Sequence, residues 1–342
     1  MLRLGIICCL LAATTLAKPQ PKTSKLPDPT EDELGDIPVV PLKLGSVGGR
    51  KSEMKDGSFQ QELENGDIPV VPLKFPGSGS GSGSGSRCGS GCQCGVSRGS
   101  RVVGGTQAAA GQFPWQAGLV FTGGTRTFCG GSVINNLYVL TAAHCTDGLA
   151  ASYMQVLLGD LRIGIADAGE QRYSVQQIIK HPQYVDAIQS GWDYALLKVD
   201  RQITYSSTVS PICLAQAGQT YAGVAGIASG FGQVGDSSPQ SNWLLYVPLT
   251  VWTQDACRGV VGSIIRSTVI CAGGSAQGGQ GICFGDSGGP LAVQVSGRYH
   301  IIGISSFMRP CAHANTPDMF ARVTEALSWI QSNTADAQYC TA

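Results

Sequence analysis

The stretch Cys283-Phe284-Gly285-Asp286-Ser287-Gly288-Gly289-Pro290 sets one serine among glycines, a common setting for a nucleophile. Two other stretches supply what such a serine needs. Thr141-Ala142-Ala143-His144-Cys145 contains a histidine, and Trp192-Asp193-Tyr194-Ala195-Leu196-Leu197 contains an aspartate. A serine hydroxyl becomes a good nucleophile only when an imidazole accepts its proton, and a carboxylate orients that imidazole and stabilises its charged form. We therefore expect the three stretches to meet in the folded protein.

The candidate catalytic residues follow the chain order His144, Asp193, Ser287, at separations of 49 and 94 positions. Subtilisin and the α/β-hydrolases use other orders of the same groups. The motifs closely resemble those of the chymotrypsin-like serine endopeptidases, over roughly residues 101–335. The resemblance implies that Ser287 is the nucleophile of an acyl-enzyme reaction, that His144 is its general base and then acid, and that Asp193 supports the histidine.

Short apolar and β-branched runs, separated by Gly, Asn and Pro, follow the first hundred residues and predict an all-β fold. The clearest runs are Gln116–Phe121, Ser132–Leu140, Met154–Leu158, Tyr173–Ile179 and Ala195–Val199, and similar runs continue to Ile304. The resemblance implies two six-stranded antiparallel β-barrels with the active site between them. The first barrel would supply His144 and Asp193, and the second would supply Ser287.

Residues 102–342 form the expected catalytic domain. One helix is predicted near its C-terminal end, because Val323, Leu327 and Ile330 recur at the spacing of one helix face. About 240 residues are ample for a large core.

The N-terminal part of the chain has a different composition. Residues 1–17 combine Arg3 with an apolar run and end in small residues, which indicates a signal peptide cut after Ala17 and a secreted protein. Residues 18–101 are rich in Pro, Lys, Glu, Ser and Gly and contain few aromatic residues. Too little apolar surface is available to offset the loss of chain entropy, so a disordered prosegment is predicted.

The prosegment contains the nonapeptide GDIPVVPLK twice, at 35–43 and at 66–74, and then a Gly/Ser linker at 77–86. Its prolines favour an extended conformation that could dock on a partner, and the alternative is a duplicated piece of linker. No later stretch contains 18 uninterrupted apolar residues, so no membrane span is expected. The formal net charge is +0, which predicts no binding to nucleic acid.

The bond between Arg101 and Val102 resembles the activation site of the family. The resemblance implies cleavage by an activating protease, after which the new α-amino group inserts against Asp286. A free α-amino group has a pKa near 8 and is charged at neutral pH, and a buried charge needs a partner. We therefore expect the uncut chain to lack a formed oxyanion hole, which the backbone N–H groups of Gly285 and Ser287 would provide.

Four residues are expected to shape the primary substrate pocket: Gly281, Ser306, Met308 and Asp318. Trypsin has an aspartate at the base of this pocket, where this chain has Gly281. An acidic residue, Asp318, stands instead on the pocket wall, which resembles the crustacean brachyurins. Met308 replaces a glycine that usually keeps the pocket open, although methionine is flexible. We expect mixed basic and apolar preference at the residue before the cleaved bond.

Thirteen cysteines in a secreted chain indicate disulfides, and removal of Cys8 and Cys9 with the signal peptide leaves eleven. The resemblance implies the pairs Cys129–Cys145, Cys257–Cys271 and Cys283–Cys311. Five cysteines remain without an assigned pairing: Cys88, Cys92, Cys94, Cys213 and Cys340. In related zymogens a prosegment cysteine bridges to the position of Cys213, which would keep the prosegment attached after cleavage.

Asp160, Asp167 and Glu170 have spacings that resemble the calcium loop of trypsins, and a solvated acidic loop explains them equally well. Catalysis is expected to need no metal and no cofactor. The expected partners are protein or peptide substrates and an activating protease, and the enzyme is expected to act as a monomer. The alternative function is a non-catalytic homologue that binds partners through residues 35–74, and the intact triad argues against it.

Overall fold

The computed structural model describes residues 91–98, 106–186, 191–307 and 311–342. The chain divides into two compact units, Met1–Ser80 and Gly81–Ala342, and all described residues lie in the second unit. The signal peptide, the repeated nonapeptide, the Gly/Ser linker and Cys88 lie outside these residues. The predicted activation bond between Arg101 and Val102 and the pocket residue Met308 also lie outside them.

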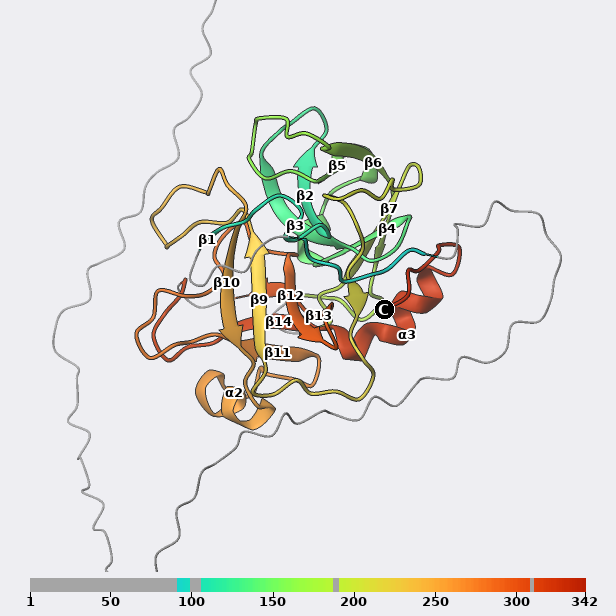
Figure 1. Cartoon of the computed structure of the whole chain (residues 1–342). Helices are drawn as coiled ribbons and strands as arrows, with labels where there is room; N and C mark the ends of the chain where they lie inside the picture. Colours follow the sequence, from blue (N-terminus) through green and yellow to red (C-terminus); the bar gives the residue numbers. More distant parts are fainter. Residues whose placement is uncertain (1–90, 99–105, 187–190, 308–310) are drawn as a thin grey trace, which may run out of the picture. The chain divides into compact units, whose positions relative to one another are not determined.

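The first half of the described chain closes into a six-stranded antiparallel barrel, drawn in green in Figure 1. Its strands are β2 (Gln116–Phe121), β3 (Thr127–Val133), β4 (Tyr138–Thr141), β5 (Met154–Leu158), β6 (Gln171–Lys180) and β7 (Ala195–Val199). They run around the barrel in the order β2-β3-β4-β7-β6-β5, and β5 pairs back onto β2. The apolar runs of the sequence coincide with β2, β5 and β7 residue for residue.

One predicted run is wrong as a single strand. Residues 132–140 contain the turn between β3 and β4, and Asn135 causes it. The side-chain oxygen of Asn135 accepts hydrogen bonds from the backbone N–H groups of Leu137 and Tyr138, at 3.0 and 2.8 Å. Such local bonds compete with the strand ladder and reverse the chain.

The second half forms a sheet in the order β1-β10-β9-β12-β13-β14-β11, with β8 parallel to β13. Its strands are β1 (Thr106–Gln107), β8 (Cys213–Leu214), β9 (Ala225–Gly230), β10 (Leu245–Thr250), β11 (Val269–Ala272), β12 (Pro290–Val295), β13 (Arg298–Phe307) and β14 (Asp318–Arg322). The six longer strands close into a barrel through one bridge between Val251 and Ala272. The predicted two-barrel fold is therefore confirmed, and two short strands, β1 and β8, are added to the second barrel.

Two α-helices accompany the barrels within the part of the chain that the structure describes. Helix α3 (Val323–Asn333) confirms the predicted terminal helix, because Val323 and Ile330 are fully buried on its inner face. Helix α2 (Gln254–Val261) was not predicted from the sequence. The Thr253 side chain caps it by accepting a hydrogen bond from the N–H of Ala256. The capping residue Thr253 is a sequence signal for the start of this helix. The helix has only eight residues, one of them a glycine, so its helical pattern in the sequence is weak.

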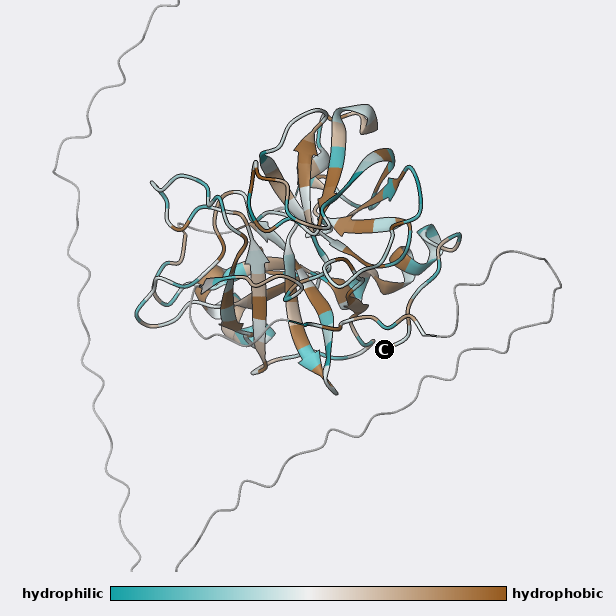
Figure 2. Ribbon diagram, turned by 45° about the horizontal axis from the view of Figure 1, so that its top comes forward, coloured by the Kyte–Doolittle hydropathy of each residue, from teal (hydrophilic) through white to brown (hydrophobic). Residues whose placement is uncertain are grey.

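Apolar side chains fill both barrels. Figure 2 shows brown, apolar positions along the strands and teal, polar positions mostly on the connections. Trp115, Tyr194 and Phe320 are among the largest fully buried side chains. Tyr194 also links the barrels, because its hydroxyl donates a 2.8 Å hydrogen bond to the carbonyl of Arg322.

Five disulfides join described residues: Cys92–Cys340, Cys94–Cys213, Cys129–Cys145, Cys257–Cys271 and Cys283–Cys311. The first two settle pairings that the sequence left open, and they hold the segment 91–98 against the second barrel. Backbone hydrogen bonds support this attachment. Gly95 donates to the carbonyl of Pro211 at 2.8 Å and accepts from the N–H of Tyr299 at 2.9 Å.

Gly95 fits this site because it lacks a side chain. Its φ angle is +67°, and an added Cβ would lie 2.6 Å from the backbone nitrogen of Tyr299. Gly148 has a similar φ angle of +68°, but an added Cβ there meets no atom within 4 Å. The two glycines therefore share the conformational requirement and differ in the space around them.

Gly95→Ala is expected to lower the free energy of unfolding by about 1–3 kcal/mol more than Gly148→Ala, since only the first substitution overpacks. Chemical denaturation of the oxidised protein measures both changes. Equal losses in the two variants would show that segment 91–98 does not contribute to the stability of the barrels.

Candidate active site

His144 and Asp193 lie at neighbouring strand ends in the first barrel. His144 opens the 3₁₀ helix η1 (His144–Thr146) after β4, and Asp193 precedes β7, which pairs with β4. The His144 Nδ1 atom lies 2.7 Å from the Asp193 Oδ2 atom, and the backbone N–H of His144 donates to Oδ1 at 2.9 Å. Asp193 is fully buried, and the histidine side chain is 28% exposed. The carboxylate therefore fixes both the ring and the backbone of His144.

The second barrel supplies a third hydrogen bond to this carboxylate. The Ser306 hydroxyl donates to Asp193 Oδ2 at 2.6 Å. Ser306 lies near the end of β13, where the pairing with β14 shifts between Ser305 and Phe307. The shift is a β-bulge, which redirects one side chain of an otherwise regular strand. The bulge therefore explains why Ser306 can reach the first barrel.

Ser287 lies in the loop before β12, and this loop contacts both barrels. The Ser287 carbonyl accepts a 2.7 Å hydrogen bond from the N–H of Gly130 in β3, and the N–H of Gly288 donates to the carbonyl of Ser305 at 2.8 Å. Gly288 has a φ angle of +79°, and any side chain there would overlap the Thr141 hydroxyl beside the histidine loop. These contacts hold Ser287 next to the histidine loop.

Within the described residues, no hydrogen bond joins the Ser287 hydroxyl to His144. The His144 Nε2 atom instead lies 3.8 Å from the sulfur of Cys145. Catalytic hydrogen bonds are often long before substrate binds, so this geometry is compatible with proton transfer in a substrate complex.

The pKa of His144 is set by two opposed effects. Burial alone would lower the pKa of the imidazole, but the hydrogen bond and negative charge of Asp193 outweigh burial and raise it above its ordinary value. Asp147 and Asp186 add smaller contributions in the same direction. A more basic imidazole is a better proton acceptor, but it must be neutral to act.

Two backbone N–H groups lie beside the serine, those of Gly285 and Ser287. Neither donates a hydrogen bond to a backbone carbonyl among the described residues. Gly285 has a φ angle of +99°, and an added Cβ would lie 3.2 Å from the Cα of Gly232. A glycine at this position therefore permits both the turn and the close approach. Free donors at this place are suited to stabilise a carbonyl oxygen that becomes negatively charged.

Comparison with known proteins identifies the domain. A model of the Trypsin family matches residues 102–330. The chain belongs to the trypsin family. It is 35% identical over 243 residues to coagulation factor XI of Bos taurus, which covers 69% of this chain and 38% of the factor. It is 34% identical over 233 residues to coagulation factor IX of Cavia porcellus, which covers 67% of this chain and 80% of the factor. The chain therefore spans well under half of the factor XI sequence.

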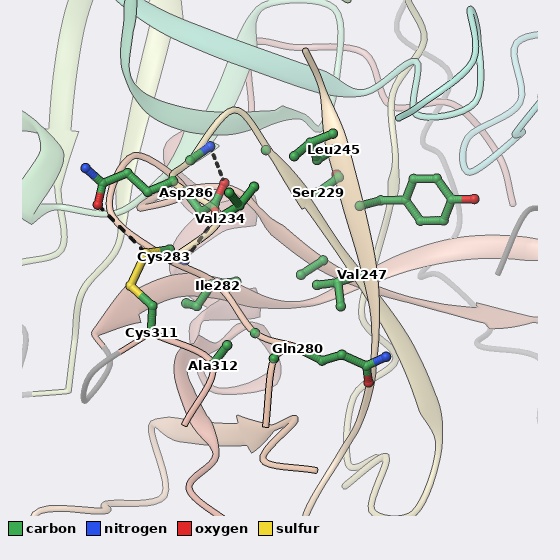
Figure 3. Close-up of a pocket in the computed structure, with 17 residues that line it drawn as sticks. Ser229, Val234, Leu245, Val247, Gln280, Ile282, Cys283, Asp286, Cys311 and Ala312 are labelled. Atoms are coloured by element: carbon green, nitrogen blue, oxygen red, sulfur yellow. Dashed lines mark hydrogen bonds between the residues drawn. A yellow bond between two sulfur atoms is a disulfide. The ribbon is translucent and has the colours of Figure 1, made fainter. Parts of the chain in front are cut away.

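Asp286, the predicted activation residue, borders a cavity of about 180 Å³ in the trypsin-family domain (Figure 3). Its two carboxylate oxygens accept hydrogen bonds from the N–H groups of Gly232 and Cys283, at 2.8 and 3.0 Å. Burial raises the pKa of Asp286 to about 6, although both hydrogen bonds act against this increase. Among the described residues, no cation pairs with the carboxylate.

The predicted pocket residues Gly281 and Asp318 lie side by side. An added Cβ on Gly281 would lie 2.7 Å from Asp318 Oδ2, so an acidic side chain at position 281 would collide with Asp318. Asp318 is 4% exposed and accepts a 2.8 Å hydrogen bond from the N–H of Ile282. Burial raises the pKa of Asp318 to about 7, the Ile282 bond lowers it, and the charge of Asp286 raises it further.

Possible metal-ligand atoms cluster at two places among the described residues. Two groups of possible ligand atoms gather within 4.8 Å there, around Cys129–Cys145 and around Cys283–Cys311, but their sulfurs are in disulfides and are not thiolates. The trio Asp160, Asp167 and Glu170 forms no such group. Asp167 Oδ2 accepts two backbone N–H bonds from its own loop, and Asp160 is buried, so the three acids do not form a freely solvated loop.

Sequence reasoning missed a second set of residues beside Ser287. Phe121, Arg126, Phe128 and Phe284 line a cavity that also includes Gly285. The only local signal was Phe284, an aromatic residue in the glycine-rich stretch. The other residues come from β2, β3 and their connection, and only the folded structure brings them there.

Asp193→Asn is expected to lower kcat/KM for peptide hydrolysis by the activated protein about 10⁴-fold, because an amide cannot hold the required histidine tautomer. In the unsubstituted protein, the acidic limb of the kcat/KM profile should have an apparent pKa above about 6.5, the ordinary imidazole value. Rates measured between about pH 5 and 9 test both points. A limb at or below the ordinary value would contradict the pairing, and Asp255→Asn on α2 serves as the control.

Proposed function

We propose that this protein is a secreted serine endopeptidase, made as a zymogen and activated by cleavage after Arg101, that hydrolyses proteins through an acyl-enzyme. The observation that carries the proposal is the buried Asp193 carboxylate, bonded to His144 and Ser306, beside the loop of Ser287. Family membership supports the same reaction class. The presence of Ser287 as well as His144 and Asp193 argues against a non-catalytic homologue, because the triad is intact.

The proposed reaction uses only groups of the chain and water. His144 removes the proton from the Ser287 hydroxyl as its oxygen bonds to the substrate carbonyl carbon, and the N–H groups of Gly285 and Ser287 stabilise the resulting oxyanion. His144 then gives the proton to the leaving amine as the peptide bond breaks. A water molecule hydrolyses the ester in the same two steps.

Activation is proposed to depend on Asp286. A carboxylate beside a cavity, held by two N–H groups and without a cation in the described part of the chain, is suited to receive the α-amino group of Val102. That group would pair with the carboxylate and stabilise its ionised form.

The prosegment is proposed to remain attached after cleavage. The Cys92–Cys340 and Cys94–Cys213 disulfides would each hold it to the catalytic domain. Five disulfides also support secretion, since such bonds persist in oxidising compartments. Among the described residues, no helix is long and apolar enough to cross a membrane.

The primary pocket is proposed to accept both apolar and basic side chains. Gly281 leaves the base neutral, and the neighbouring Asp318 provides one buried acidic group that a basic side chain could ionise. The resemblance to brachyurin pockets rests on these two residues, and the two relatives named above are coagulation factors.

The function is tested by labelling with a serine-directed phosphonate before and after cleavage at Arg101. We expect stoichiometric labelling of the cleaved protein, almost none of the uncut protein, and none of cleaved Ser287→Ala. N-terminal sequencing should find Val102 as a new terminus, and the prosegment should separate only after reduction. Cleaved protein that neither reacts nor hydrolyses casein would favour the binding homologue.

The pocket is tested by the pH dependence of its preference. Asp318 is largely neutral below its pKa of about 7 and ionised above it, so the ratio of kcat/KM for Arg over Leu before the cleaved bond should rise through neutral pH. Cleavage of both substrates depends on His144 in the same way, so the titration of His144 cancels in the ratio. Asp318→Asn should flatten the ratio and lower it, and Asp255→Asn should leave it unchanged. A ratio independent of pH in the unsubstituted enzyme would exclude this role of Asp318.

A further inference from the structure

One cluster of charged and polar side chains lies beside the candidate catalytic histidine and takes no part in the reaction steps above. Asp147 follows the 3₁₀ helix η1, and its backbone N–H donates to the carbonyl of His144 at 3.4 Å. One oxygen of its carboxylate accepts a 2.7 Å hydrogen bond from the Tyr184 hydroxyl, and the other accepts a 2.9 Å bond from the Lys180 ammonium. We call Asp147, Tyr184 and Lys180 the histidine clamp.

The three residues of the histidine clamp contact one another in pairs. The Lys180 ammonium lies 5.9 Å from the centre of the Tyr184 ring, within the range of a cation–π contact. The Lys180 and Asp147 side chains are 42% and 49% exposed, and an ion pair so exposed adds little to stability. The main effect of the clamp is therefore to fix the Asp147 carboxylate beside the histidine turn.

Tyr184 belongs to a turn that rests on the two residues flanking Asp193. The N–H of Tyr184 donates to the carbonyl of His181 at 2.9 Å, and the N–H of His181 donates to the carbonyl of Tyr194 at 2.9 Å. The His181 ring stacks on Trp192 with centroids 4.5 Å apart and planes 7° apart. The clamp therefore connects the turn of the catalytic histidine to both sides of the catalytic aspartate, in addition to their own hydrogen bond.

The clamp also sets part of the charge around the imidazole. Burial lowers the pKa of His144, and Asp193, Asp147 and Asp186 raise it, in decreasing order of effect. Burial would raise the pKa of Asp147, but the two clamp hydrogen bonds outweigh it and hold that pKa below the ordinary value. Asp147 is therefore ionised across the range in which the imidazole titrates, and Lys180 is the cation paired with it.

Resting on the proposed function, we propose that Asp147 and Tyr184 are positioning residues of the protease. Their hydrogen bond holds the turn of His144 against the loop of Asp193, and the Asp147 carboxylate places a second negative charge beside the imidazole. Neither residue exchanges a proton with the substrate. Lys180 completes the clamp, but its charge opposes that of Asp147. The two actions, orientation and charge, therefore predict different changes in the kinetics.

The experiment measures kcat and KM of the activated full chain for one peptide substrate between about pH 5 and 9. Tyr184→Phe tests orientation, because it breaks the clamp and changes no charge. We expect kcat to fall about two- to tenfold, the rate equivalent of one hydrogen bond. The KM and the apparent pKa of the acidic limb should stay unchanged, since neither substrate binding nor the charge at the imidazole is altered.

Two further variants test charge, because each breaks the same ion pair from the opposite side. Asp147→Asn removes a negative charge, so the acidic limb of the kcat/KM profile should move to lower pH by about 0.2–0.7 units, the range of a half-exposed charge pair. Lys180→Met leaves the charge of Asp147 unopposed, so the limb should move to higher pH. A purely structural role of the clamp predicts no such opposite shifts.

Asp200→Asn is the matched control. Asp200 pairs with Arg201 at 3.0 Å and follows β7, so it lies at the other end of that strand from Asp193. This variant removes an ion-paired aspartate of the same barrel and should keep both kcat and the limb. Phosphonate titration of Ser287 in every variant normalises the rates to folded, competent enzyme.

The outcomes separate this inference from the function on which it rests. An unchanged kcat in Tyr184→Phe would overturn the orienting role. Limbs that stay in place, or move in the same direction, in Asp147→Asn and Lys180→Met would overturn the charge role, and in both cases an enzyme that labels fully at Ser287 leaves the function intact. Absence of labelling and cleavage in the unsubstituted protein would instead reject the proposed function.

Discussion

The buried carboxylate of Asp193 is the constraint on which the arrangement of the two barrels depends. A fully buried and unpaired carboxylate would cost several kcal/mol, so its donors must be in place in the folded state. Two donors, the ring and backbone N–H of His144, come from the first barrel, and the third, Ser306, comes from the second. The charge is therefore satisfied only when both barrels have formed and docked. The contact that would orient the base also holds the two halves together.

The loop that contains Ser287 also connects the two barrels, but it does so through backbone hydrogen bonds and not through a buried charge. Ser287 accepts a hydrogen bond from Gly130 of the first barrel, and Gly288 donates to Ser305 of the second. The approach is so close that a side chain at position 288 would strike Thr141. Residues far apart in the sequence thus meet where the two barrels approach too closely for a side chain at position 288.

Local patterns in the sequence predicted the parts of the structure that depend on local physics. Strands β2, β5 and β7 are short apolar runs that end before a polar or glycine residue, Thr122, Gly159 and Asp200, and their limits were predictable. The turn at Asn135 and the start of helix α2 each depend on the hydrogen bonds of one polar side chain, which an apolar pattern does not reveal. The bulge at Ser306 depends on the register between two strands, and the register is set by the fold as a whole.

The functional residues also fall into two groups: those that local sequence motifs reveal and those that only the folded structure brings together. Each of the three motifs is contiguous in the sequence, so His144, Asp193 and Ser287 could be identified from it. The residues of the aromatic cavity, such as Phe121 and Phe284, instead come from different barrels.

Two buried acids outside the triad, Asp286 and Asp318, differ in the source of the cation that would pair with each. Asp286 and Asp318 both have pKa values above the 3.9 or so of a free aspartate, about 6 and about 7. These two groups therefore bind more protons in the folded than in the unfolded state between about pH 4 and 7, and their contribution to stability is lost as the pH rises through that window. At neutral pH a neighbouring cation would stabilise the ionised carboxylate of each acid. In the proposed mechanism the chain itself supplies one to Asp286 on cleavage, while Asp318 receives one only from a basic substrate.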